Sequence, residues 1–162
     1  MKGNLRRKFV SPTKGLLVRD FIDYLEEELL NFDKFPEEYL LFVEEIFSNI
    51  HLYSARNSWK ILHFLPSENL TVEQFQRLGQ VIRKHFFSYS EYMLYDISCD
   101  FVARTCSSKY ALELFEKFLE YEFDDIHRRS ILVGLNVLLV HGCDTVECEK
   151  KARLLADRIS TT

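Results

Sequence analysis

The side chains best placed for chemistry are two carboxylates and a guanidinium at helical spacing. Asp96 and Asp100 lie four residues apart and Arg104 follows after four more, so a helix would put all three on one ridge close to Tyr92. Paired carboxylates can act as general acid and base, or hold a cation. The same ridge is also typical of a solvated helix face with an i,i+4 ion pair. Without a nucleophile or a substrate clamp, the pair does not define a reaction.

A second group is the H-x-C-x₄-C pattern of His141, Cys143 and Cys148. A zinc site needs three or four ligands that converge on a tetrahedron, and no fourth ligand is visible nearby. Cys148 also falls on the apolar stripe of the last expected helix, where a free cysteine commonly packs as a small hydrophobe. The sequence therefore predicts no metal and no other cofactor.

A third group consists of Glu122, Asp124, Asp125 and His127, which could chelate a cation or supply an acid–base pair. Acids at the start of a helix more commonly cap free backbone N–H groups and favour the positive end of the helix dipole. The sequence contains no phosphate-binding glycine loop, no nucleophile elbow and no H-E-x-x-H pair. These patterns together predict a protein that is not an enzyme.

The elements that carry these groups are expected to be helices. Apolar residues recur with a period of 3.6 and no segment shows convincing β-strand alternation, while Gly and Pro number only 5 and 3. About eight helices are predicted, beginning near residues 16, 36, 54, 71, 90, 108, 125 and 144. Capping boxes are expected at Thr71 and at Ser88, and an N-cap at Asp144. The apolar stretch 130–140 should be buried on most sides.

The helix starts are evenly spaced. Odd- and even-numbered helices each advance by about 35–38 residues, which indicates four antiparallel pairs that share a continuous core. This spacing, with segments such as YALELFEKFLEY (110–121), resembles the HEAT and armadillo-like helical repeats over roughly residues 16–160. The resemblance implies an all-α solenoid over residues 16–162, behind a basic amino-terminal arm of residues 1–15. An irregular helical bundle is the alternative, because helices of average length give a similar spacing.

Charge is spread unevenly along the chain, whose formal net charge is −4. Residues 1–19 carry six basic groups and no acid, whereas residues 20–50 carry ten acids against one lysine, a net of −9. The acidic block contributes seven carboxylates that fall off the apolar stripes: Asp23, Glu26, Glu27, Glu37, Glu38, Glu44 and Glu45. Such a block is often only a solvated face. Its self-repulsion would be relieved by the basic arm folding back or by a basic partner.

Architecture and charge together predict a non-catalytic module that binds a basic protein. Its expected contacts are the seven carboxylates of the acidic block and the ridge of Tyr92, Asp96 and Asp100. By analogy of size, charge and fold, the chain looks like bacterial immunity proteins, inhibitors that occlude a toxin such as a basic nuclease.

Two other functions stay open. A nucleic-acid-associated protein could use the basic arm, although the net negative charge and the lack of a basic stripe on the helical body argue against nucleic acid. An unrecognised enzyme could use Asp96 and Asp100. The longest apolar run, 131–140, is about half the length of a membrane-spanning helix. Because no signal-peptide pattern is present either, the sequence predicts a cytoplasmic protein that does not bind membranes.

Overall fold

The fold is that of a computed structural model of the chain, which describes residues 8, 10–11, 15–16, 18–29, 37–48, 70–104, 107–120 and 124–161. The helix expected near residues 54–65 lies outside them. The described part is all-α, and its α-helices are α2 (Val18–Leu29), α3 (Glu37–Ser48), α6 (Val72–His85), α7 (Glu91–Asp96), α8 (Ser108–Phe118), α9 (Asp125–His141) and α10 (Val146–Ser160). A short 3₁₀ helix, η2 (Phe86–Ser88), precedes α7, and a π-helix, η3 (Ile97–Val102), continues it.

Two strands of two residues each precede α2. β1 (Val10–Ser11) and β2 (Gly15–Leu16) pair antiparallel. The sequence did not predict them, because a pair this short cannot show the alternation over four or more residues that marks a strand. The pair also crosses the boundary that was predicted at residue 15 between the amino-terminal arm and the helical domain.

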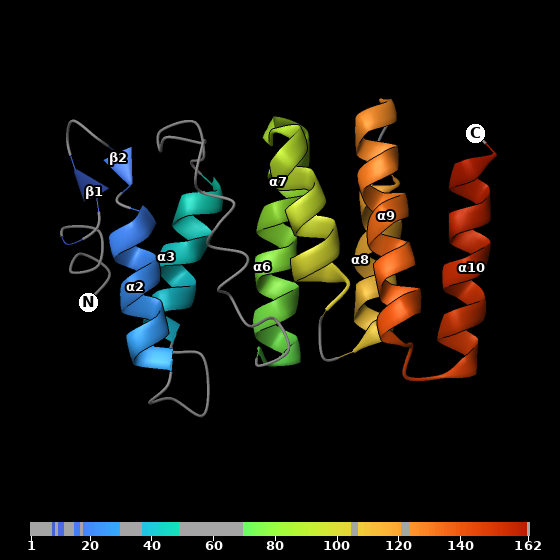
Figure 1. Cartoon of the computed structure of the whole chain (residues 1–162), viewed down its shortest axis with the longest axis horizontal. Coiled ribbons are helices and arrows are strands. Elements are labelled where there is room, and N and C mark those ends of the chain that lie inside the picture. The colour runs from blue at the N-terminus through green and yellow to red at the C-terminus, as the bar shows by residue number, and fades with distance from the viewer. Residues whose placement is uncertain are drawn as a thin grey trace.

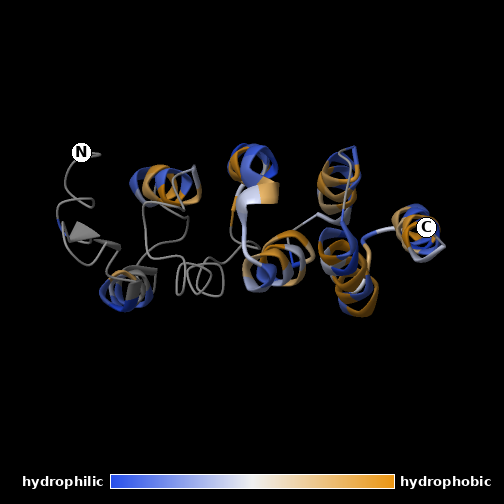
Figure 2. Cartoon of the chain, turned by 90° about the horizontal axis from the view of Figure 1, so that it is seen from above, coloured by the Kyte–Doolittle hydropathy of each residue, from blue (hydrophilic) through white to orange (hydrophobic). Residues whose placement is uncertain are grey.

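The helices lie side by side with their axes nearly parallel (Figure 1), and end-on they form two rows (Figure 2). One row holds α2, α7 and α9, and the other holds α3, α6 and α8, with α10 at the end of the stack. The contacts between helices follow the order of the helices in the two rows. α3 packs on α6, α6 on α8 and α8 on α10, while α7 and η3 pack on α9, which in turn packs on α10.

Capping explains where α6 and α7 begin. The Thr71 hydroxyl accepts a hydrogen bond from the Gln74 backbone N–H while the Gln74 side chain accepts one from the Thr71 N–H, which is the predicted capping box. The cap of α7 is Ser90, whose hydroxyl accepts from the Met93 N–H. The prediction of a cap at Ser88 was wrong, because that residue ends the 3₁₀ turn instead.

The start of α10 differs from the prediction, and the residue expected to cap it bonds the start of α8 instead. Thr145 caps α10 by accepting from the Cys148 N–H, so the expected cap at Asp144 was wrong. Asp144 instead accepts a hydrogen bond from the Ser108 backbone N–H at 2.9 Å, and its own N–H donates to the Ser108 hydroxyl at 2.9 Å. Ser107 is the N-cap residue of α8, but its side chain makes no capping bond. A loop between α9 and α10 therefore caps α8.

Aromatic rings make up much of the core. Phe86 stacks on Phe118 with ring centroids 4.3 Å apart, and Phe75 stacks on Phe101 at 5.0 Å. Among the described residues, seven phenylalanines are less than 2% exposed: Phe21, Phe47, Phe75, Phe86, Phe101, Phe115 and Phe118. Such offset and edge contacts contribute beyond the area they bury.

α9 and η3 approach each other closely at Gly134. A Cβ atom on Gly134 would lie 2.7 Å from the Cβ of Ser98, 2.8 Å from the Ser98 carbonyl oxygen and 2.8 Å from the Phe115 ring. Real Cβ atoms do not come this close to backbone, so the helices can touch here only because residue 134 has no side chain. Ser98 is fully buried within the π-turn that faces this contact.

α9 is less buried than its sequence predicted. Val133 is 39% exposed, Val140 is 83% exposed, and Asn136 between them is exposed as well. The expectation that stretch 130–140 is buried on most sides was therefore wrong for one outward stripe. Among the described residues, no helix combines the length and apolar character needed to cross a membrane.

Candidate functional site

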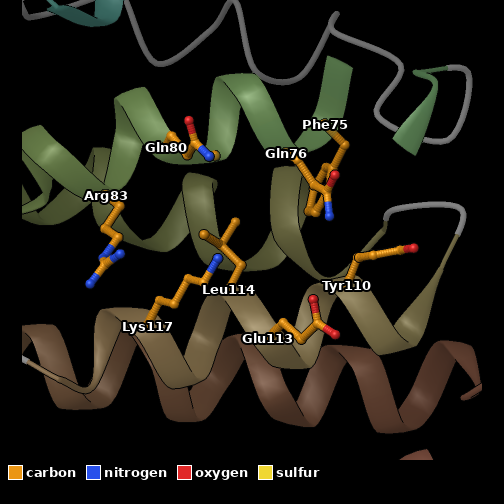
Figure 3. Close-up of a pocket in the computed structure, with 9 residues that line it drawn as sticks. Phe75, Gln76, Gln80, Arg83, Tyr110, Glu113, Leu114 and Lys117 are labelled. Atoms are coloured by element: carbon orange, nitrogen blue, oxygen red, sulfur yellow. The ribbon is translucent and has the colours of Figure 1, made fainter. Parts of the chain in front are cut away.

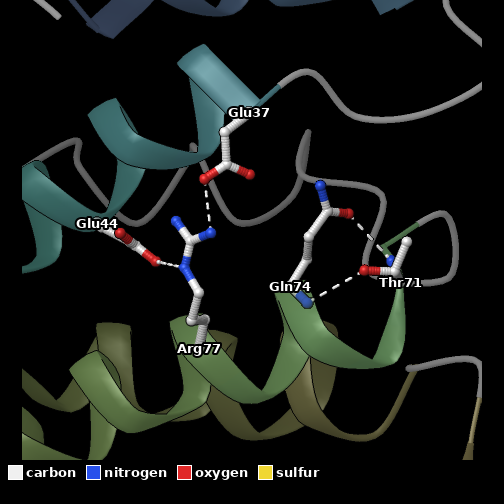
Figure 4. A network of polar contacts seen from close by, with 5 residues as sticks. All are labelled: Glu37, Glu44, Thr71, Gln74 and Arg77. Carbon is white, nitrogen blue, oxygen red and sulfur yellow. Dashed lines mark hydrogen bonds and ion pairs between the residues drawn. The ribbon is translucent and has the colours of Figure 1, made fainter.

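The acidic carboxylates of α3 surround a single guanidinium supplied by α6. Arg77 donates from Nε to Glu44 at 3.0 Å and from Nη1 to Glu37 at 2.5 Å, as Figure 4 shows. The hydrogen bonds that Arg77 donates to Glu44 and, second, to Glu37 raise the pKa of Arg77 above its usual value. The Glu44 side chain is only 17% exposed, so this pair lies at the edge of the interface between the two helices. Part of the acidic block is thus neutralised within the chain.

The other two predicted carboxylates of α3 line a hollow beside this ion pair. Glu38 and Glu45 border a depression of about 330 Å³ between α3 and α6, together with Leu41, Phe42, Glu44, Ser48 and Val81. Its lining combines three apolar side chains with three carboxylates. That combination suits the side chain of a lysine or arginine, whose aliphatic stem and charged head need different surroundings.

The carboxylates of α2 lie on the opposite row. Asp23, Glu26 and Glu27 are exposed on α2, in the row that also holds α7 and α9 (Figure 2). Lys8 of the basic arm contacts this helix, with its ammonium 4.2 Å from the centroid of the Tyr24 ring. The predicted acidic block is therefore split between two rows of the stack.

α2 and α3 are held together by aromatic contacts. The Tyr39 hydroxyl donates to the Tyr24 hydroxyl at 2.6 Å, and Phe21 meets Phe42 edge to face with centroids 4.9 Å apart. These contacts lie between the two groups of carboxylates. Acidic groups separated in this way cannot act on one small ligand, but they can contact one large partner.

The predicted ridge is present. Tyr92 and Asp96 lie on α7, and Asp100 lies in the π-helix η3 that continues it. Tyr92 is 77% exposed and is among the most exposed large apolar side chains of the described residues. Asp96 and Asp100 are half-buried, and Asp100 lies 3.9 Å from Arg104, the i,i+4 pair that the sequence predicted. Burial, helped by the nearby aspartates, raises the pKa of Cys99 to about 11. A thiol with that pKa is protonated at neutral pH and is a poor nucleophile.

A second hollow, which sequence reasoning missed, lies between α6 and α8 (Figure 3). It has a volume of about 160 Å³ and is bordered by Gln76, Gln80, Tyr110, Glu113 and Lys117. Arg83 also borders it and forms an ion pair with Glu120 at 2.5 Å. Its residues come from two helices more than twenty residues apart in sequence, so no local pattern could reveal it. The charges are mixed, and no group in it is placed for catalysis.

The polar cluster at the start of α9 is a cap. The Asp124 carboxylate accepts a hydrogen bond from the His127 backbone N–H at 3.1 Å and lies 2.5 Å from His127 Nδ1. These hydrogen bonds lower the pKa of Asp124, first of all the one from the backbone. The His127 ring is buried against Phe86 and Phe87. Glu122 lies outside the described residues.

Metal ligands do not gather in the part of the chain that the structure describes. No group of three or more His, Cys, Asp or Glu side chains there is arranged to hold an ion. Cys143 and Cys148 are half-buried free thiols that pack against the core, and burial raises the pKa of Cys143.

Comparison of the chain with models of protein families, with curated proteins and with solved structures gives no match. The candidate site is accordingly defined by its geometry. It consists of the hollow beside Glu38 and Glu45 on one row, and of the α2 carboxylates and the Tyr92 ridge on the other.

Proposed function

We propose that this protein is a non-catalytic binding module, a stack of antiparallel helix pairs that docks a basic protein through the acidic surface of its first helix pair. The row-by-row contacts of α3, α6, α8 and α10 favour a solenoid-like stack of the HEAT or armadillo kind. The polar outer face of α10 is what such a stack needs at its end.

The observation that carries the proposal is the acidic lining of the hollow between α3 and α6. Glu38, Glu44 and Glu45 all border it, and Arg77 holds Glu44 and Glu37 at one side. A lysine or arginine of the partner would lay its stem on Leu41 and place its head between these carboxylates, where charge-assisted hydrogen bonds are strong.

An inhibitor or immunity-type role follows if the partner is a toxin with a basic surface, such as a nuclease. The net of −9 over residues 20–50 accelerates encounter with a basic partner through long-range attraction. Occlusion of the partner requires only surface complementarity, so no reacting group is needed in this chain. The exposed Asp23, Glu26 and Glu27 would widen the contact around the end of the stack.

The experiment compares proteins captured from the native host by the wild type and by a variant carrying Glu38→Lys and Glu45→Lys. Basic proteins that the wild type retains and the variant loses are candidates for the partner. Each is then purified, and its association rate with wild-type protein is measured at increasing salt. We expect a rate that falls with salt and that is at least about tenfold lower for the variant, because attraction has become repulsion.

The matched control is Glu147→Lys and Glu149→Lys on α10, which changes the charge equally at the other end of the stack. It should capture the same partners as the wild type. Glu37 and Glu44 are left intact in all variants because they hold Arg77. If the α3 variant captures every basic protein that the wild type does, at an unchanged association rate, the acidic surface is only a solvated face and the proposal fails.

A further inference from the structure

The hollow between α6 and α8 exists where α6 has no side chain. A Cβ on Gly79 would lie 3.1 Å from Leu114 Cδ2, and both residues line the hollow. Together with Phe75 they form the buried, apolar part of its lining. The volume is about 160 Å³. Because an apolar cavity of about 150 Å³ takes up benzene, this space suits a ligand of about six to nine non-hydrogen atoms.

Two opposite charges on the α8 side of the hollow do not pair with each other. Glu113 precedes Lys117 by four residues, which is the order and spacing at which such pairs form best on a helix. The same two residue types on α10, Glu147 and Lys151, are joined at 3.4 Å. Within the described part of the chain, Glu113 and Lys117 form no ion pair. Figure 3 shows the Lys117 ammonium pointing toward α6 and the Glu113 carboxylate pointing toward the side of Tyr110.

The remaining charged group at the hollow is already neutralised. Arg83 on α6 pairs with Glu120 at 2.5 Å. One positive charge, on Lys117, and one negative charge, on Glu113, therefore face the space between the helices. A ligand with a single charge would match only one of them, whereas a zwitterion matches both with charge-assisted hydrogen bonds.

We propose that this hollow binds a free α-amino acid with a small aliphatic side chain. Its ammonium group donates to the Glu113 carboxylate, and its carboxylate accepts from the Lys117 ammonium. Glu113 and Lys117 are about 6 Å apart along α8. The two charged groups of an amino acid are about 3 Å apart and each hydrogen bond adds about 3 Å, so the ligand spans two side chains that point away from each other.

The other lining residues fit the rest of such a ligand. Its aliphatic side chain lies on Leu114 and Phe75, and the available volume excludes large side chains. The amides of Gln76 and Gln80 can both donate and accept, so they can bond the ammonium and carboxylate positions that the two charges do not meet. This hollow shares no residue with the one beside Glu38 and Glu45. The site therefore goes beyond the proposed function, and either can fail without the other.

The test titrates L-valine into the full chain labelled with ¹⁵N and follows the backbone amide signals by NMR. We expect signals of α6 and α8 to shift and the binding to saturate, with a dissociation constant below about 10 mM. N-acetyl-L-valine lacks the ammonium group and L-valinamide lacks the carboxylate. Each should bind at least about tenfold more weakly than valine, because one charge of the hollow then has no counterpart.

Two variants assign the charges to the two ends of the ligand. Lys117→Gln should remove the preference for valine over valinamide and keep the preference over N-acetylvaline, and Glu113→Gln should do the reverse. Glu116→Gln on α8 and Lys84→Gln on α6 make the same changes at exposed positions outside the hollow. They should leave the binding of all three ligands unchanged. Circular dichroism should show that all variants fold.

Three outcomes would overturn the proposal. The first is a wild type that does not bind valine at about 10 mM. The second is equally tight binding of valine and of N-acetyl-L-valinamide, which has the form of a residue within a peptide chain, because the hollow would then take a segment of another protein. The third is an equal weakening of every ligand by Lys117→Gln and by Glu113→Gln, because the two charges would then only maintain the shape of the hollow.

Discussion

The two ends of the stack differ in what adds to their apolar packing. At the first helix pair, α3 packs on α6 through buried side chains of the common core. Arg77 also bonds Glu37 and Glu44 at the edge of this interface, and the buried Tyr89 hydroxyl donates to the Phe47 carbonyl at 3.1 Å. α7 to α10 are joined by contacts so close that one position tolerates no side chain. We expect the first interface to respond to the removal of charge and the second to an increase in volume. Substitutions of equal size should therefore act differently at the two ends.

Gly134→Ala should give the largest effect. The added Cβ would meet backbone and Cβ of Ser98 and the Phe115 ring at 2.7–2.8 Å, and backbone cannot move aside without parting α9 from η3. We expect a loss of about 3 kcal/mol in the free energy of unfolding. Chemical denaturation followed by circular dichroism measures it.

The matched control is Gly79→Ala on α6. Its Cβ would lie 3.1 Å from Leu114 Cδ2, the end of a flexible side chain that can shift. The gain in helix propensity, about 1 kcal/mol, offsets the crowding, so the net change should stay below about 1 kcal/mol. Equal losses at both glycines would show that the C-terminal half is not held by close contact.

Arg77→Met tests the other end. It retains the aliphatic stem but removes both ion pairs and leaves the Glu44 carboxylate, which is 17% exposed, without its guanidinium. We expect a loss of about 1–2 kcal/mol, more than for a typical exposed pair because Glu44 stays partly desolvated. Denaturation midpoints at low and high salt measure the charge component.

Arg153→Met is the corresponding change at the C-terminal end, where Arg153 pairs with Glu149 at 2.9 Å on the exposed side of α10. Its cost should be only a few tenths of a kcal/mol, as for other i,i+4 pairs on helix surfaces. Adding Glu44→Gln to Arg77→Met should restore part of the lost stability. If both arginine variants lose the same amount, the first helix pair does not depend on Arg77.

Thr71→Ala should have an intermediate effect, since it removes one half of the capping box at the start of α6. The Gln74 N–H would lose its acceptor, at a cost of about 1 kcal/mol. Thr145→Ala at the start of α10 makes the same chemical change at a cap with no reciprocal side-chain bond. Its cost should be equal or smaller. A larger loss at Thr145 would contradict the importance assigned to the capping box.

Local signals in the sequence predicted the helices well. Leu40, Val43 and Phe47 follow one another at steps of three and four along α3, as Phe75, Leu78 and Ile82 do along α6, and all six are buried. Capping chemistry is equally local, which explains the agreement at Thr71 and Asp124.

What the sequence could not predict depends on distant partners. Asp144 has the right position to cap α10, yet it bonds Ser108, which lies 36 residues away in sequence. No residue close to Glu37 or Glu44 in the sequence indicates that Arg77 pairs with them. The acidic block was therefore predicted as one surface rather than two. The π-helix at 97–102 replaces regular helix where the chain packs on α9, and the periodicity of the sequence does not reveal it. The exposed stripe of α9 was missed for the same reason, since valine does not show which side is covered.

The smallest expected effect concerns Asp124 and is confined to acid pH. Hydrogen bonds from the His127 backbone N–H and ring hold the pKa of Asp124 below its ordinary value of 3.8. A lowered pKa means that the charged carboxylate stabilises the folded state. This contribution to the free energy of unfolding is complete above the ordinary pKa and is lost as the pH falls through the lowered pKa.

Asp124→Asn keeps an acceptor for the His127 N–H but cannot titrate, and asparagine caps helices about as well as aspartate. At pH 7 the variant should therefore unfold at nearly the same denaturant concentration as the wild type. Below about pH 4 the wild type should lose stability more steeply than the variant, which denaturation curves for both proteins across the acid range would measure. Parallel acid profiles would mean that the charge of Asp124 does not stabilise the start of α9.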